Sequence, residues 1–143
     1  MTLRLIPAIH RAAHRIGLLL EQPPHLGVTQ GEAHILAHLE AAGPSTVARL
    51  HYAFAHKRST LTSILDRLDA RGLVRREISS RDRRSFVIRL TPEGKKLAGR
   101  AYRRLATFEA VILKTAGGRQ LRGFDAVVTA IEARAMAART RMT

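Results

Sequence analysis

The chain has 143 residues, of which 25 are Lys or Arg and 11 are Asp or Glu, so its formal net charge is +14. An apolar fraction of 45% with a charged fraction of 25% is typical of an ordinary globular chain and excludes disordered and fibrous classes, and the length fits one domain. The absence of Cys excludes disulfide scaffolds, thiolate-bound zinc, iron–sulfur clusters and thiol catalysis.

Apolar residues that recur at helical spacing predict three helices in the first third of the chain. The first helix covers 5–20 and ends at Gln22-Pro23-Pro24. The second begins at the capping box Thr29-Gln30-Gly31-Glu32, in which a hydroxyl precedes a carboxylate by three residues. A third, short helix is capped by Ser45 or Thr46.

A fourth helix is predicted over 57–70, and Gly72 terminates it. Apolar residues at i, i+3, i+4 and i+7 give this helix one face for burial: Leu61, Ile64, Leu65 and Leu68. The opposite face carries small or polar side chains: Ser59, Thr62, Ser63, Asp66 and Arg67.

The second half of the chain is predicted to form a hairpin followed by two helices. The strands cover 73–78 and 86–90, and the charged tip Ser79-Ser80-Arg81-Asp82-Arg83-Arg84-Ser85 joins them. The next helix opens at Thr91-Pro92-Glu93-Gly94 and ends at Gly117-Gly118. The last helix has apolar residues at spacings of 3, 4, 3, 4 and 3, a coiled-coil-like seam: Leu121, Phe124, Val128, Ile131, Ala135 and Ala138.

The basic excess is concentrated in the last two thirds of the chain. Residues 57–89 have 10 basic and 4 acidic side chains and residues 90–143 have 11 and 4, whereas residues 1–56 have 4 and 3. Of the 25 basic residues 21 are Arg, whose planar fork suits phosphates and guanine edges. A polyanionic partner is therefore expected, and a solvated Arg-rich surface is the alternative.

The order of the predicted elements is that of a winged helix-turn-helix. The fold class is therefore mainly α with a small antiparallel β-hairpin wing and flanking dimerisation helices. Helix 57–70 would lie in the major groove of DNA, where its small side chains let the backbone approach. The hairpin would reach the minor groove, because a narrow minor groove concentrates negative potential and favours Arg.

These residues resemble the MarR-type (multiple antibiotic resistance regulator) transcription factors, which are winged-helix dimers. The resemblance covers essentially the whole chain. Four segments carry it in order: Ser59-Thr60-Leu61-Thr62-Ser63-Ile64-Leu65-Asp66-Arg67-Leu68, Arg71-Gly72-Leu73-Val74, Asp82-Arg83-Arg84-Ser85 and Leu90-Thr91-Pro92-Glu93-Gly94. It departs from the family at Lys57, where a Ser or Asp cap is common, and at His56 and His51.

The resemblance implies roles for particular residues. It implies that Asp82 positions Arg84, which enters the minor groove, and that Arg58 contacts the major groove together with the small residues after it. When the neighbouring basic side chains are included, the expected DNA contacts are Lys57, Arg58, Ser59, Thr62, Ser63, Arg67, Arg76, Arg81, Asp82, Arg83 and Arg84.

Histidines occur in two pairs at i and i+4, His10 with His14 and His34 with His38, a spacing that can place two imidazoles on one metal. The chain has no His-Glu-x-x-His pattern, so hydrogen-bonded or exposed helix histidines are expected and no metal or cofactor is. The resemblance implies that a small effector binds between the dimerisation helices and the winged helix. The residues expected there are Arg11, His14, Arg15, His34 and His38.

The sequence therefore predicts a homodimeric, sequence-specific regulator of transcription that binds double-stranded DNA at an inverted-repeat operator. It is expected to be a repressor relieved by a small molecule and to have no catalytic activity. We expect one domain over 1–143, with a winged core at 27–91 and dimerisation helices at 1–22 and 92–143. No apolar run approaches the ~20 residues of a membrane span, so a cytoplasmic protein is expected. Two alternatives stay open: a nonspecific architectural or RNA-binding protein, and a metal-dependent enzyme that uses the His pairs.

Overall fold

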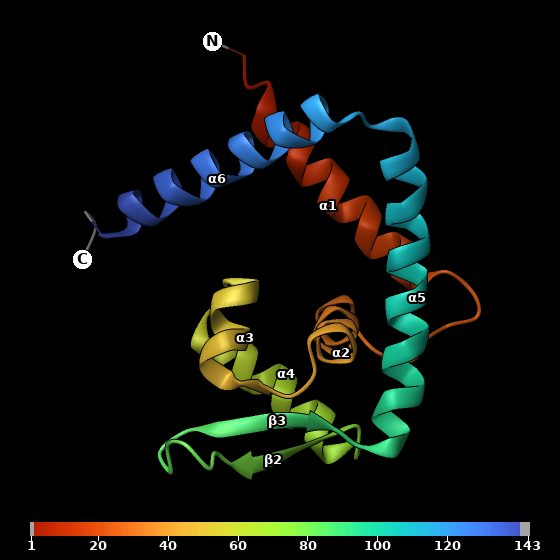
Figure 1. The fold of residues 1–143 in the computed structure, drawn as a ribbon, viewed down its shortest axis with the longest axis vertical. Helices are drawn as coiled ribbons and strands as arrows, with labels where there is room; N and C mark the ends of the chain where they lie inside the picture. The colour runs from red at the N-terminus through yellow and green to blue at the C-terminus, as the bar shows by residue number, and fades with distance from the viewer. Residues whose placement is uncertain (1, 141–143) are drawn as a thin grey trace. The chain divides into compact units, whose positions relative to one another are not determined.

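A computed structural model of the chain describes residues 2–140 as mainly helical with a small antiparallel sheet (Figure 1). This confirms the predicted fold class. The elements in chain order are α1 (Leu5–Glu21), α2 (Gln30–Ala42), β1 (Ser45–Thr46), α3 (Val47–Phe54), α4 (Arg58–Ala70), β2 (Val74–Ile78), β3 (Phe86–Leu90), α5 (Pro92–Thr115) and α6 (Gly118–Thr140).

The sheet has the strand order β1-β3-β2. Strands β2 and β3 pair antiparallel, with Val74 opposite Leu90 at one end and Ile78 opposite Phe86 at the other. Strand β1 pairs with the other edge of β3 and places Ser45 opposite Ile88. The sequence did not predict β1, because a strand of two residues is too short to show alternation.

Side-chain caps fix the starts of α2, α3 and α5. At α5 the Gly94 amide donates to Thr91 Oγ1 at 3.0 Å, so the predicted Thr91 cap is confirmed. At α2 the predicted capping box is confirmed: the Glu32 amide donates to Thr29 Oγ1 at 3.3 Å, and the Thr29 amide donates to Glu32 Oε2 at 3.0 Å. At α3 the Arg49 amide donates to Thr46 Oγ1 at 3.2 Å, so Thr46 is the cap and also the last residue of β1.

The chain divides into two compact units, and the first extends through Leu105. Its larger core joins α2, α3, α4 and the sheet, and the predicted inner face of α4 is buried in it. The fully buried large side chains are Ile35, Leu36, Leu50, Leu61, Leu65, Leu68, Val74 and Ile88. A smaller core joins the end of α1 to α2 and to α5 through Leu20, Leu26, Ala33, Ala37 and Ala101.

Arg104 on α5 holds the connection between α1 and α2. Its guanidinium donates to the carbonyl oxygens of Leu20 at 3.0 Å, Gln22 at 2.8 Å and Pro24 at 2.9 Å. The last carbonyls of a helix lack partners within the helix. Arg104 therefore caps the C-terminus of α1 from another element.

The second unit begins at Ala106 and holds the end of α5 and all of α6. Large apolar side chains are exposed on both helices: Phe108, Val111, Ile112, Leu113, Phe124, Val127 and Met136. Within the predicted α6 seam, Leu121, Val128 and Ile131 are partly buried. Across the described residues, no helix is both long and apolar enough to cross a membrane.

Candidate nucleic-acid interface

Helix α4 turns its polar face outward. Its apolar side chains are buried in the core, which leaves Ser59, Thr62 and Ser63 exposed on the other side. Lys57 occupies the N-cap position and makes no side-chain cap bond, so the first amides of α4 are not capped by its side chain. A helix N-terminus with open amides and nearby cations favours anions.

Contacts between aromatic side chains stabilise the turn between α3 and α4. Ala55 adopts a left-handed conformation with φ of 51°, which turns the chain out of α3. The imidazole of His56 stacks on Phe54, with centroids 6.0 Å apart and planes 10° apart. His38 on α2 meets the same Phe54 ring edge-on at 5.4 Å. His56 thus packs where the family resemblance leads one to expect an apolar residue.

The wing tip has its own hydrogen bonds. The hydroxyl of Ser79, a buried residue, accepts from the amides of Arg81 and Asp82 at 3.2 and 3.4 Å. The Ser79 amide donates to the Ser85 carbonyl at 3.0 Å and closes the tip. The Asp82 carboxylate accepts from the Arg84 amide at 2.9 Å. Asp82 therefore fixes Arg84 through the backbone.

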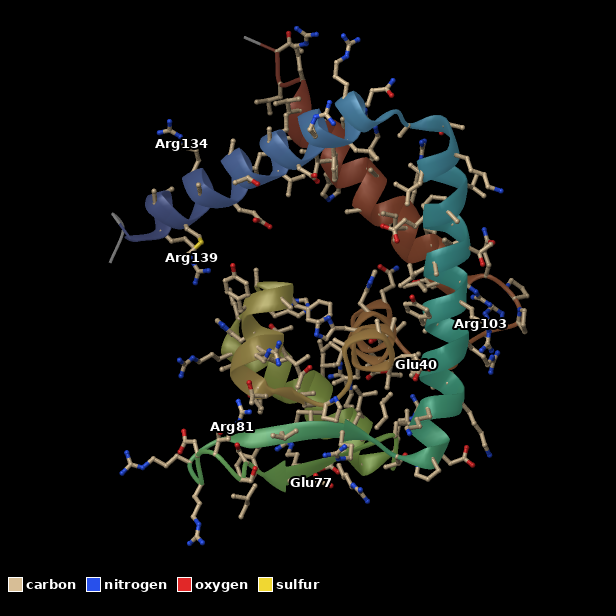
Figure 2. All side chains as sticks on the ribbon, viewed as in Figure 1. Glu40, Glu77, Arg81, Arg103, Arg134 and Arg139 are labelled. Atoms are coloured by element: carbon tan, nitrogen blue, oxygen red, sulfur yellow. The ribbon has the colours of Figure 1, made fainter. Side chains whose placement is uncertain are left out.

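Several basic residues at this surface make no ion pair within the described part of the chain: Lys57, Arg58, Arg81, Arg83 and Arg84. They lie at the start of α4 and in the wing tip, and all are exposed. Figure 2 shows Arg81 at the hairpin end of the sheet. Unpaired and exposed cations are available to phosphates.

Two of the expected DNA contacts are instead paired with acids. Arg76 on β2 binds Asp66 on α4, and Arg67 on α4 binds the buried carboxylate of Glu32 on α2 at 2.7 Å. Sequence reasoning missed Glu32 and Asp66 as partners. Glu32 was visible only as a capping residue, because the pair it forms spans 35 positions.

The buried carboxylate of Glu32 is stabilised as an anion. Burial by itself raises the pKa of Glu32, but hydrogen bonds from Arg67 and from the Thr29 amide, together with the charges of Arg67 and Arg71, hold it below its ordinary value. Glu77 on β2 is similar, since Arg89 and Arg75 lower the pKa of its carboxyl from both sides (Figure 2 shows Glu77 on this strand).

The five expected effector residues fall into two separate sets. Arg11, His14 and Arg15 are exposed on α1, whereas His38 packs against Phe54 and His34 lies near His56. Burial lowers the pKa of His34, and the charge of His56 lowers it further. Within the described residues, no group of three or more His, Asp or Glu is arranged to hold a metal ion.

An open pocket of about 760 Å³ lies elsewhere, between the α1–α2 connection and the end of α4. None of the five expected effector residues lines it. Leu20, Leu26 and Val28 supply apolar wall, and Glu32, Arg67 and Arg71 supply charge.

Comparisons with known proteins address the winged segment directly. Residues 26–85 match the model of the MarR family. The winged segment is therefore similar to the MarR family. The resemblance stated from the sequence is thereby confirmed, and the matched MarR segment contains α2, α3, α4, β2 and the whole wing tip.

A curated relative is named as a transcriptional repressor. The chain is 33% identical over 76 residues to the HTH-type transcriptional repressor MdtR of Bacillus subtilis (strain 168). The match covers 53% of this chain and spans about half, 49%, of that relative.

Solved structures of other proteins share the fold. The transcription regulator MarR from Oenococcus oeni PSU-1 superposes with a TM-score of 0.75 at 18% identity, over 90% of this chain and 96% of that chain. The S. aureus MepR–DNA complex superposes with a TM-score of 0.74 at 19% identity, over 93% and 99%.

Proposed function

We propose that this chain is a homodimeric regulator of transcription that binds double-stranded DNA at an inverted-repeat operator and represses. The observation that carries the proposal is the exposed polar face of α4 beside a wing tip of unpaired arginines, within a segment that is similar to the MarR family. In this arrangement α4 reads the major groove and the tip reaches the minor groove. The protein acts by binding, not by catalysis.

Similar proteins support the choice of DNA as the partner. MdtR is named as a transcriptional repressor, and MepR has been solved as a complex with DNA. The basic side chains of this chain suit the same partner. Lys57 and Arg58 lie at the start of α4, and three arginines lie in the wing tip: Arg81, Arg83 and Arg84.

Exposed apolar side chains support the dimer. Leu5, Ile6 and Ile9 are exposed on α1 of the first unit. The second unit exposes Phe108, Ile112 and Phe124, among others. Monomeric proteins rarely expose so many large apolar groups, and a second copy of the chain would cover them.

Relief by a small molecule is the last part of the proposal. The pocket beside Arg67 and Arg71 supports it better than the residues expected from the sequence, since it combines apolar wall with charge and adjoins α4. The predicted set of Arg11, His14, Arg15, His34 and His38 stays a second candidate for that role.

The test of this function is selection of bound fragments from genomic DNA, followed by titration on a selected operator and on a scrambled duplex. A regulator should prefer its operator by about 10³-fold or more at one fixed salt concentration. Equal affinity for both duplexes would instead identify a nonspecific architectural protein. Preference for single-stranded RNA would identify an RNA-binding protein.

A further inference from the structure

A chain of polar contacts runs from a buried carboxylate to the exposed face of α4. Glu32 sits in the first turn of α2, and its side chain is only 4% exposed. Its Oε2 accepts from the Thr29 amide, and its Oε1 accepts from Arg67 Nε at 2.7 Å. A buried carboxylate that accepts two hydrogen bonds is held in one position, because breaking either bond costs free energy.

Arg67 extends this contact to the reading face. Its Nη1 donates to the hydroxyl oxygen of Ser63 at 2.8 Å, one turn earlier on α4. Ser63 is exposed among the small polar residues that face outward. Arg67 thus uses two of its donors inside the protein, and Ser63 presents its hydroxyl on the exposed face of α4.

The bond from Arg67 restricts what Ser63 can do. A serine hydroxyl has one proton and two acceptor lone pairs. The guanidinium fills one of the two lone pairs and directs the proton away from Arg67. Its positive charge also polarises the hydroxyl, which favours donation to a partner over acceptance at the remaining lone pair. In the major groove, acceptors are presented by guanine, by N7 of adenine and by O4 of thymine, whereas cytosine presents a donor.

We propose that Glu32, acting through Arg67, fixes the hydroxyl of Ser63 as a hydrogen-bond donor and so sets a preference for a base edge that accepts. Glu32 and Arg67 are then positioning residues that determine specificity without touching DNA. This inference rests on the proposed function, since it presumes that α4 reads the major groove.

The experiment compares operator preferences of the full chain and its variants. Ser63→Ala first locates the base pair in each half-site whose preference depends on the hydroxyl. We expect a preference of about fivefold at that base pair in the wild type, the worth of one hydrogen bond, and its loss in Ser63→Ala. Arg67→Lys should lose it too, because one ammonium cannot bridge Glu32 and Ser63 as the guanidinium fork does.

Glu32→Gln tests the far end of the chain of contacts. Glutamine can replace glutamate in a capping box, so the start of α2 is kept while the charge that holds Arg67 is removed. We expect the fivefold preference to fall below about twofold. In the Ser63→Ala background neither Arg67→Lys nor Glu32→Gln should lower the preference further.

The matched control is Arg71→Lys. Arg71 also approaches Glu32, at 3.8 Å, but donates to the Gly27 carbonyl and not to Ser63. The Arg71→Lys variant should therefore retain the fivefold preference. Thermal unfolding of every variant identifies any that fail to fold. If Glu32→Gln does not fold, Arg67→Lys alone tests the proposal, because Arg67 is exposed and its replacement should not disturb the core.

The results separate this inference from the proposed function. Retention of the base preference by folded Arg67→Lys would overturn the role of Arg67 while the regulator stands. Equal weakening of all sequences by Ser63→Ala would overturn it as well, since Ser63 would then bind a phosphate. A wild type that does not distinguish operator from scrambled duplex would instead reject the proposed function itself.

Discussion

Arg76 on β2 and Asp66 on α4 form an ion pair that joins the wing to the helix proposed to read DNA. Both side chains are partly exposed, so the pair adds at most about 1 kcal/mol to the free energy of unfolding. Its larger effect is on charge. Without Arg76, the carboxylate of Asp66 would stand unneutralised on the surface that approaches phosphates.

The first prediction follows from this pair. Arg76→Ala should weaken binding to all duplexes about equally, and adding Asp66→Asn should restore part of the loss. Titrations at several salt concentrations measure both effects. Arg75→Ala is the control, because Arg75 pairs with Glu77 instead. No recovery in the double variant would mean that Arg76 binds DNA independently of Asp66.

A second prediction concerns the wing tip. Asp82→Ala should weaken operator binding although it removes a negative charge, because the Arg84 amide loses its acceptor. Arg84→Ala should cost most on operators with A·T-rich flanks, where the minor groove is narrow. Titration of both variants on operator and scrambled duplex checks this. Tighter operator binding by Asp82→Ala would leave the tip as a nonspecific phosphate clamp.

The proposed dimer gives a third prediction. Val128→Asp with Ile131→Asp places charges in the α6 seam and should yield monomer or insoluble protein, with loss of tight operator binding. Sedimentation measures the mass. Ala133→Asp is the control, since Ala133 lies on the exposed opposite side of α6. A double variant that keeps the dimer mass would place the interface elsewhere.

A fourth prediction concerns stability. Arg104→Ala removes the donor to the carbonyl groups of Leu20, Gln22 and Pro24, at the end of α1 and just after it. One hydrogen bond to a charged group contributes about 2 kcal/mol, and solvent can replace the donor at the more exposed carbonyls. The free energy of unfolding should fall by about this amount in chemical denaturation. Its neighbour Arg103 is exposed (Figure 2), so Arg103→Ala should change it by less than about 0.5 kcal/mol.

The fifth prediction is a pH dependence. The pKa of His34 is lowered in the folded chain by burial and by the charge of His56, so the folded state binds fewer protons there than the unfolded state. The stability from neutral His34 is therefore full above the ordinary pKa of 6.5 and declines as the pH falls below it. His34→Gln should flatten the profile of unfolding free energy against pH, which chemical denaturation at a series of pH values measures. Parallel profiles for wild type and His34→Gln would contradict this.

Local signals made much of the fold predictable. The capping box at Thr29 and the apolar face of α4 are recorded within a few residues of sequence, and both are confirmed. The contact of Arg67 with Glu32 and the contacts of Arg104 were not predictable, because the partners lie 35 positions away for Arg67 and 80 or more for Arg104. A pattern records which face a residue occupies but not which group lies across from it.

The histidines illustrate the same limit. The spacing of His34 and His38 shows that they share a face of α2, but it does not show that α3 and the following turn cover that face. Their neighbours are therefore Phe54 and His56, and the predicted effector set is not gathered into one place. The pocket beside Arg71 was missed because its wall is the α1–α2 connection, whose backbone has no periodic signal.

Because β3 is paired on both edges, the wing tip can be replaced without disturbing the sheet that supports it. The base of the wing is anchored by β1 on one side, by β2 on the other and by the buried Ile88 between them. The Ser79–Ser85 bond marks the border of the tip. A tip of different sequence or length, grafted between those two serines, would rest on an unchanged base. Minor-groove preference could then be redesigned without repacking the core.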